Sequence, residues 1–245
     1  MESRPSQDQV IEAFVVHLAA LCHPGLQIID WPDKKPGASR EIDALAESPD
    51  VRVAIEHTSV DSFDDQRADS ARFMEVIGKL ESELRGQIPS SLHLIVDCGA
   101  VPTKTSWKKI HDILRSWIEN AVHALPEGKS EHNIPGVPFP VYIRKDSSGK
   151  PGLSVARYAP DDHTLPDRLR SQIKDKAAKL NKYKEAGCFT ILLLESSDIA
   201  LMSPSILRSA VKTACSPDLP AGVDSIWYAD TAVPETVEFW DITPV

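Results

Sequence analysis

Apolar and polar residues follow two periods along the chain, one typical of helices and one typical of strands. Apolar residues spaced three and four apart predict amphipathic helices over residues 8–22, 64–86, 105–125, 164–186 and 203–215. Short apolar runs between turn residues predict strands over residues 26–32, 91–99, 188–198, 223–230 and 236–242. Strands and helices alternate along most of the chain, which predicts an α/β fold.

Two of the predicted strands, 92–97 and 189–195, are nearly continuous apolar runs. Such runs are typical of strands covered on both faces, so we expect both at the centre of one mixed sheet flanked by helices. Residues 125–164 are rich in Pro, Gly and Ser, and the strands predicted at 139–145 and 153–159 could pair as a hairpin insertion. With no repeat or linker in view, the sequence predicts a single α/β domain over residues 1–245.

An acidic residue lies inside each strand of a predicted hairpin over residues 40–47 and 51–60. Asp43 and Glu56 are each flanked by Ile and Ala, where a strand is ordinarily buried. A small bulge or shift of register would bring the two carboxylates together. Adjacent carboxylates repel unless a cation lies between them, and oxygen ligands suit Mg²⁺, Mn²⁺ or Ca²⁺. The alternative is a pair of solvent-facing acids on an edge hairpin.

The segment "REIDALAE…VRVAIEHT" resembles the core of the PD-(D/E)XK nuclease superfamily, which has the restriction-endonuclease-like fold. That core runs helix, strand with Asp, strand with Glu-x-Lys, helix and strand, an order that residues 8–98 follow. The resemblance implies that Asp43 and Glu56 bind Mg²⁺ or Mn²⁺ with help from the backbone carbonyl of His57. It also implies a further acid on the first helix, where Glu12 is the only one well inside.

Thr58 departs from this family pattern, which has Lys at that position. The family Lys orients the attacking water or stabilises the charged transition state. Thr58 can hydrogen-bond a water but carries no charge, so a nuclease would need a Lys from elsewhere. Lys79 is our preferred candidate and Lys176 the second, although Lys79 could equally be a surface residue beside its apolar stripe. The ring of His57 points away from Glu56, which favours a packed core histidine over a catalyst.

Charge is unevenly distributed along this acidic chain. The net charge is −9 and the isoelectric point about 5.4, which argues against a general nucleic-acid coat. The helix predicted over 164–186 is nevertheless basic. Its lysines are candidate phosphate contacts, with a solvated helix face as the alternative: Lys174, Lys176, Lys179 and Lys182.

These patterns predict a metal-dependent nuclease whose substrate is DNA in preference to RNA. Thr58 and the acidic charge favour a second hypothesis, a non-catalytic relative that serves as a binding or assembly module. A third is an unrelated α/β protein with acids on its surface. The polar start of the chain and the absence of a long apolar run predict a cytoplasmic protein without membrane contact. A homodimer and a complex subunit both remain open.

Overall fold

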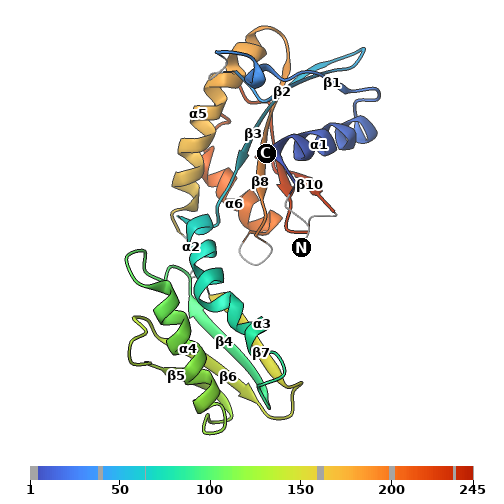
Figure 1. Ribbon diagram of the computed structural model, residues 1–245. Coiled ribbons are helices and arrows are strands. Elements are labelled where there is room, and N and C mark those ends of the chain that lie inside the picture. The colour runs from blue at the N-terminus through green and yellow to red at the C-terminus, as the bar shows by residue number, and fades with distance from the viewer. Residues whose placement is uncertain are drawn as a thin grey trace. The chain divides into compact units, whose positions relative to one another are not determined.

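A computed structural model of the protein (Figure 1) describes residues 5–37, 41–63, 65–158, 163–198, 202–233 and 236–244. The chain forms two compact units. The first unit consists of Met1–Phe63 and His163–Val245, and the inserted unit consists of Asp64–Asp162. The sequence predicted a single domain with an insertion over 125–164. The structure instead gives residues 64–162 a sheet and a core of their own.

The first unit is built on a six-stranded mixed sheet with the strand order β1-β2-β3-β8-β9-β10. Its strands are β1 (Gln27–Asp30), β2 (Ala44–Glu47), β3 (Arg52–Ser59), β8 (Phe189–Ser196), β9 (Ser225–Asp230) and β10 (Glu238–Asp241). β2 pairs antiparallel with both β1 and β3, whereas β8 runs parallel to β3 and β9. β8 is therefore an inner strand. Seven of its eight residues are buried, as its apolar sequence predicted.

Helices cover both faces of this sheet. On one face lies α1 (Gln7–Leu21), which begins at a capping box formed by Ser6 and Gln9. Its apolar stripe shares a core with Val53 and Ile55 of β3. The opposite face carries α5 (Leu165–Glu185) and α6 (Pro204–Ala214).

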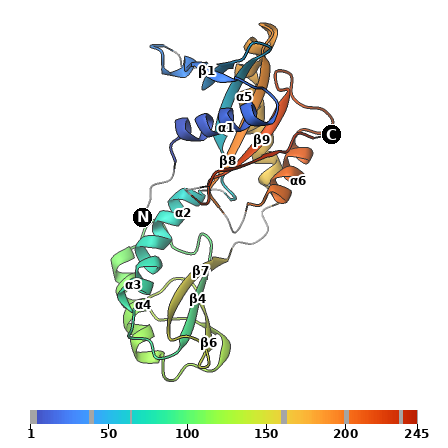
Figure 2. The ribbon, with the colours of Figure 1, turned by 90° about the vertical axis from the view of Figure 1, so that its right-hand side faces the viewer.

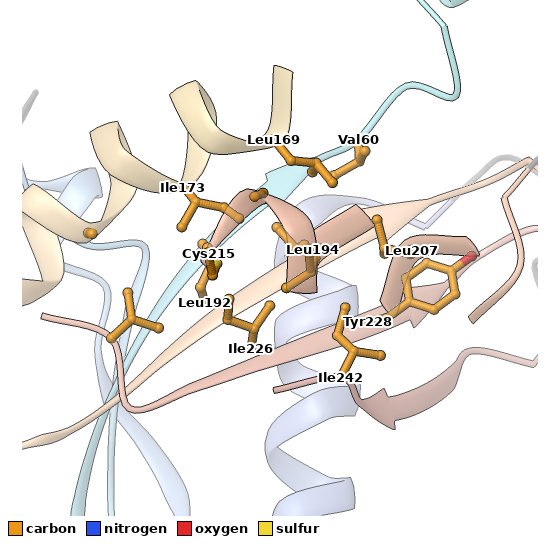
Figure 3. Close-up of a cluster of buried hydrophobic side chains, with 14 of the residues drawn as sticks. Val60, Leu169, Ile173, Leu192, Leu194, Leu207, Cys215, Ile226, Tyr228 and Ile242 are labelled. Carbon is orange, nitrogen blue, oxygen red and sulfur yellow. The ribbon is translucent and has the colours of Figure 1, made fainter. Parts of the chain in front are cut away.

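The face under α5 and α6 holds the larger apolar cluster of the first unit (Figure 3). Side chains from α5, α6, β8 and β9 interleave there, as expected for a helix layer packed on a sheet. Among those drawn are Leu169, Ile173, Leu192, Leu194, Leu207, Ile226 and Tyr228.

The inserted unit has a four-stranded sheet with the order β5-β6-β4-β7. Its strands are β4 (Ser91–Asp97), β5 (Gly128–His132), β6 (Val141–Asp146) and β7 (Gly152–Tyr158). Its helical segments are α2 (Gln66–Phe73), a π-helical turn (Met74–Gly78), α3 (Lys79–Glu83) and α4 (Trp107–Ala121). Leu92, Leu94 and Ile143 point toward these helices and form a second core with them.

Three strand predictions are corrected by the inserted unit. Residues 92–97 do form an inner strand, β4, but in this second sheet and with every other residue partly exposed. The hairpin predicted from 139–145 and 153–159 does not form, because β4 lies between β6 and β7 and pairs with both. β5, which pairs with β6, was not predicted.

The segment that follows the acidic hairpin in the first unit is also reassigned. The sequence predicts residues 64–86 and 91–99 as the next helix and strand of the core, but both belong to the inserted unit. In the first unit the helix that follows β3 and packs on it is α5, on the face opposite α1, and the strand parallel to β3 is β8. None of the described helices combines the length and apolar character that crossing a bilayer requires.

Candidate active site

The register of β2 and β3 places the two predicted acids side by side. Ala44 is paired with Ile55, so Asp43 and Glu56 are the next positions along the two strands. Ala54, two residues before Glu56 on the same face of β3, packs in the cluster under α5. Asp43 and Glu56 therefore both lie on the sheet face that α5 covers.

Asp43 is held in place by the backbone of the neighbouring strand. Its Oδ2 accepts a hydrogen bond from the backbone N–H of His57 at 2.6 Å, and the residue is only 7% exposed. A carboxylate buried in this way needs a donor, and this bond supplies one. It also ties the residue before β2 to the middle of β3.

Glu56 is fully buried and receives two lysines from α5. Its Oε1 accepts hydrogen bonds from Lys176 Nζ at 2.6 Å and from Lys179 Nζ at 2.9 Å. The two lysines are three residues apart, so they lie on one face of the helix. The other oxygen, Oε2, is buried and has no hydrogen-bond partner among the described residues.

A third acid, Asp33, stands close enough to Asp43 to be affected by its charge. It lies in a 3₁₀ turn (Pro32–Lys34) that follows β1. Burial, and then the charge of Asp43, raise the pKa of Asp33, and its buried Oδ1 has no partner within the described chain. Sequence reasoning missed this residue, since it sits in a turn without an apolar pattern.

Burial is also the main reason why the pKa of Glu56 is raised, with the charge of Asp43 second. Hydrogen bonds from Lys176 and Lys179 oppose these effects. The site therefore concentrates negative charge in a buried place and only partly neutralises it.

The last turns of α5 hold a second carboxylate, that of Glu41. Glu41 accepts hydrogen bonds from Lys182 Nζ at 2.7 Å and from the Tyr183 hydroxyl at 2.6 Å. Burial, and then the hydrogen bond to Glu41, raise the pKa of Tyr183. Lys176, Lys179 and Tyr183 thus follow one stripe of α5, which runs beside the acids of the β2 region.

The remaining predicted residues lie away from these contacts. Thr58 is half-buried on β3, two positions beyond Glu56. Lys174 is exposed on α5. Lys79 belongs to the inserted unit, where its exposed ammonium pairs with Glu75 at 2.6 Å. Glu12 is exposed on α1, which packs on the opposite face of the sheet, so the structure does not bring it to the acid pair.

The His57 side chain is part of a buried network on the face opposite Glu56. Its Nε2 lies 2.8 Å from Glu195 Oε2 on β8, and the Thr231 hydroxyl donates to Glu195 Oε1 at 2.7 Å. All three residues are buried. The side chain of His57 is therefore packed in the core and hydrogen-bonded there.

The donor set suits a hard divalent cation. The described residues contain no group of three or more Asp, Glu, His or Cys side chains in a metal-binding arrangement. Asp43 and Glu56 can nevertheless supply two carboxylates, and the unpartnered Glu56 Oε2 is an acceptor without a donor. Mg²⁺ commonly binds through one or two carboxylates and takes its other ligands from water and substrate phosphate.

Comparison with known proteins gives no match for this chain, either among family models or among curated proteins and solved structures.

Proposed function

We propose that the protein is a metal-dependent phosphodiesterase that cleaves DNA. In this proposal the first unit is a restriction-endonuclease-like core, and the inserted unit lies between β3 and α5 in the sequence. The order α1, β1, β2, β3, α5, β8 supports it, because Asp43 directly precedes β2, Glu56 lies on β3 and β8 runs parallel to β3.

The observation that carries the proposal is the pair of lysines on Glu56. Thr58 carries no charge, and phosphodiester cleavage needs positive charge near the scissile phosphate. Lys176 and Lys179 place two ammonium groups at the acid pair, from the helix that packs against β3. They take the role that we predicted for Lys79 or Lys176.

Each residue then has a defined task. Asp43 and Glu56 would hold the divalent cation, which when bound activates water and offsets charge on the phosphate. Lys176 and Lys179 contribute positive charge from α5. Burial keeps these groups in one geometry and strengthens their electrostatic interaction with a phosphate.

Cleavage assays with Mg²⁺ or Mn²⁺ test this function. Supercoiled plasmid and labelled oligonucleotides should be cut by the wild type and left intact by Asp43→Asn and Glu56→Gln. Matched RNA oligonucleotides test the preference for DNA. A wild type that is inactive on all substrates with both metals would contradict the proposal.

A second function, a non-catalytic binding or assembly module, is favoured by one specific contact. Lys176 and Lys179 already partner Glu56 Oε1, so this oxygen is satisfied without a metal. A thermal-shift titration separates the two functions, because a ligand of the folded state alone raises the unfolding temperature. A shift at millimolar MnCl₂ supports the nuclease, whereas no shift favours the module.

A cytoplasmic location and assembly as a homodimer or complex subunit remain predictions. Sedimentation of the purified chain would decide the oligomeric state.

A further inference from the structure

The inserted unit presents a sheet face that is rich in ring and cationic side chains. Leu92, Leu94 and Ile143 point toward the helices and the core. Successive side chains of a strand alternate between faces, so His93, Ile95 and their neighbours point the other way. Figure 2 shows α3 and α4 on one side of β4, β6 and β7.

The strand register arranges this face in rows. Tyr142 of β6 is paired with Ile95 of β4 on one side and with Glu131 of β5 on the other. Tyr158 of β7 is paired with Asp97 of β4, two residues beyond Ile95. The two tyrosines therefore flank β4 with an apolar side chain between them.

A row of cationic and imidazole side chains runs next to this aromatic row. Arg144 is paired with Lys129 on β5 and with His93 on β4. Arg144 is two residues from Tyr142 on the same strand, a separation of about 7 Å. Neither Lys129 nor Arg144 forms a salt bridge within the described part of the chain. Both side chains are exposed, and the charge of Arg144, after the larger effect of the Ser148 hydrogen bonds, helps to lower the pKa of Asp146 two residues further along β6.

A pocket of about 470 Å³ opens on this face and includes both tyrosines, Ile95, Arg144 and Lys129 in its lining. This volume lies in the range of small-ligand sites. Tyr158 is 62% exposed, so its ring is available for stacking. The carboxylates of Glu131 and Asp97 lie close enough to raise the pKa of the Tyr142 hydroxyl, after the larger effect of burial. They are acceptors for the amino groups of a base.

We infer that this face of the inserted unit binds single-stranded DNA, with bases on Tyr142 and Tyr158 and a phosphate on Arg144 and Lys129. Aromatic rings stack on any exposed base, whereas the bases of a duplex are already stacked on one another. A cationic row beside an aromatic row fits a strand whose phosphates and bases run side by side. The choice of DNA rests on the proposed function.

Fluorescence anisotropy with a labelled single-stranded oligonucleotide tests this inference on the full chain. EDTA is present, so no strand is cut. Tyr142→Ala and Tyr158→Ala should each weaken binding about tenfold, which is typical of the loss of one stacked base. Tyr142→Phe and Tyr158→Phe keep the ring and should bind within about twofold of the wild type. Arg144→Ala should also weaken binding and reduce its salt dependence.

Arg115→Ala is the matched control for Arg144→Ala, because Arg115 lies on α4 and pairs with Glu119. It should bind like the wild type, and unlabelled duplex should compete at least tenfold less well than single strand. Alanine variants that bind normally, equal competition by duplex, or no binding by the wild type would each overturn the inference.

The same samples keep this inference separate from the proposed function. If binding depends on the tyrosines and no metal supports cleavage, the nuclease proposal is wrong and the strand-binding inference stands. If the wild type cleaves and the tyrosine variants bind normally, the strand-binding inference is wrong and the nuclease proposal stands.

Discussion

Lys176 Nζ lies 2.6 Å from Oε1 of Glu56, although the two residues are 120 positions apart in the sequence. α5 brings this ammonium and that of Lys179 to Glu56 on β3. The uncharged Thr58, at the position of the family Lys, cannot supply such a charge. The inserted unit lies between the two partners in sequence. The carboxylate and the ammonium groups therefore come from two distant segments of the sequence, which the fold of the first unit brings into contact.

Replacing both lysines tests their role in the reaction. Lys176→Ala/Lys179→Ala should lower the turnover of a plasmid or oligonucleotide about 10²-fold or more, since one preorganised stabiliser can contribute that much. Initial rates at saturating Mn²⁺ measure the effect. Mn²⁺ affinity should not fall, because neither lysine is a ligand.

Lys174→Ala and Lys79→Ala are matched controls for the lysine pair. Lys174 is exposed on the same helix, and Lys79 pairs with Glu75 in the inserted unit. Both variants should cleave at the wild-type rate. Full activity in Lys176→Ala/Lys179→Ala, or loss of activity in Lys79→Ala, would assign the cationic role to a different residue.

The sequence predicted the acid pair and gave Lys176 as the second candidate for the cation, but it preferred Lys79 and gave Lys179 only as a phosphate contact. Asp43 and Glu56 could be found because each interrupts an apolar strand pattern, and a short hairpin leaves few registers open. The lysine contacts could not be found in the same way. Residues 64–99 show a helix followed by a strand, the order expected after the hairpin, so the start of the insertion carried no local signal. The spacing of Lys176, Lys179 and Tyr183 does indicate one helical stripe, but not which strand it faces.

The raised pKa of Glu56 makes stability depend on pH in the absence of divalent metal. Burial and Asp43 hold this pKa above the ordinary value of 4.5, so folding favours the protonated carboxyl. The stability that Glu56 contributes is full below that ordinary value and is lost as pH rises through the raised pKa. Urea unfolding from about pH 4 to about pH 8 measures this loss.

Glu56→Gln is the reference for this titration, because it lacks the ionisable carboxyl group. The free energy of unfolding of the wild type minus that of the variant should fall as pH rises. A constant or rising difference would show that Glu56 does not carry a raised pKa.

The buried His57–Glu195 contact should matter for stability. His57→Ala removes the imidazole from the buried carboxylate of Glu195 on β8, and loss of one partner of a buried pair typically costs roughly 3 kcal/mol. Denaturant unfolding near neutral pH measures the cost. His123→Ala, at an exposed position, should change stability by less than about 0.5 kcal/mol. Equal stability of the two variants would mean that the His57 contact adds nothing.

Calorimetric titration with Mn²⁺ tests most directly whether Asp43 and Glu56 form a divalent-cation site. The wild type should bind Mn²⁺, and affinity should rise with pH as Glu56 ionises. Asp43→Asn and Glu56→Gln should each abolish this binding while circular dichroism shows an unchanged fold, and the exposed Glu12→Gln should bind like the wild type. Undiminished binding in the double variant Asp43→Asn/Glu56→Gln, or no binding by the folded wild type, would contradict the site proposed here.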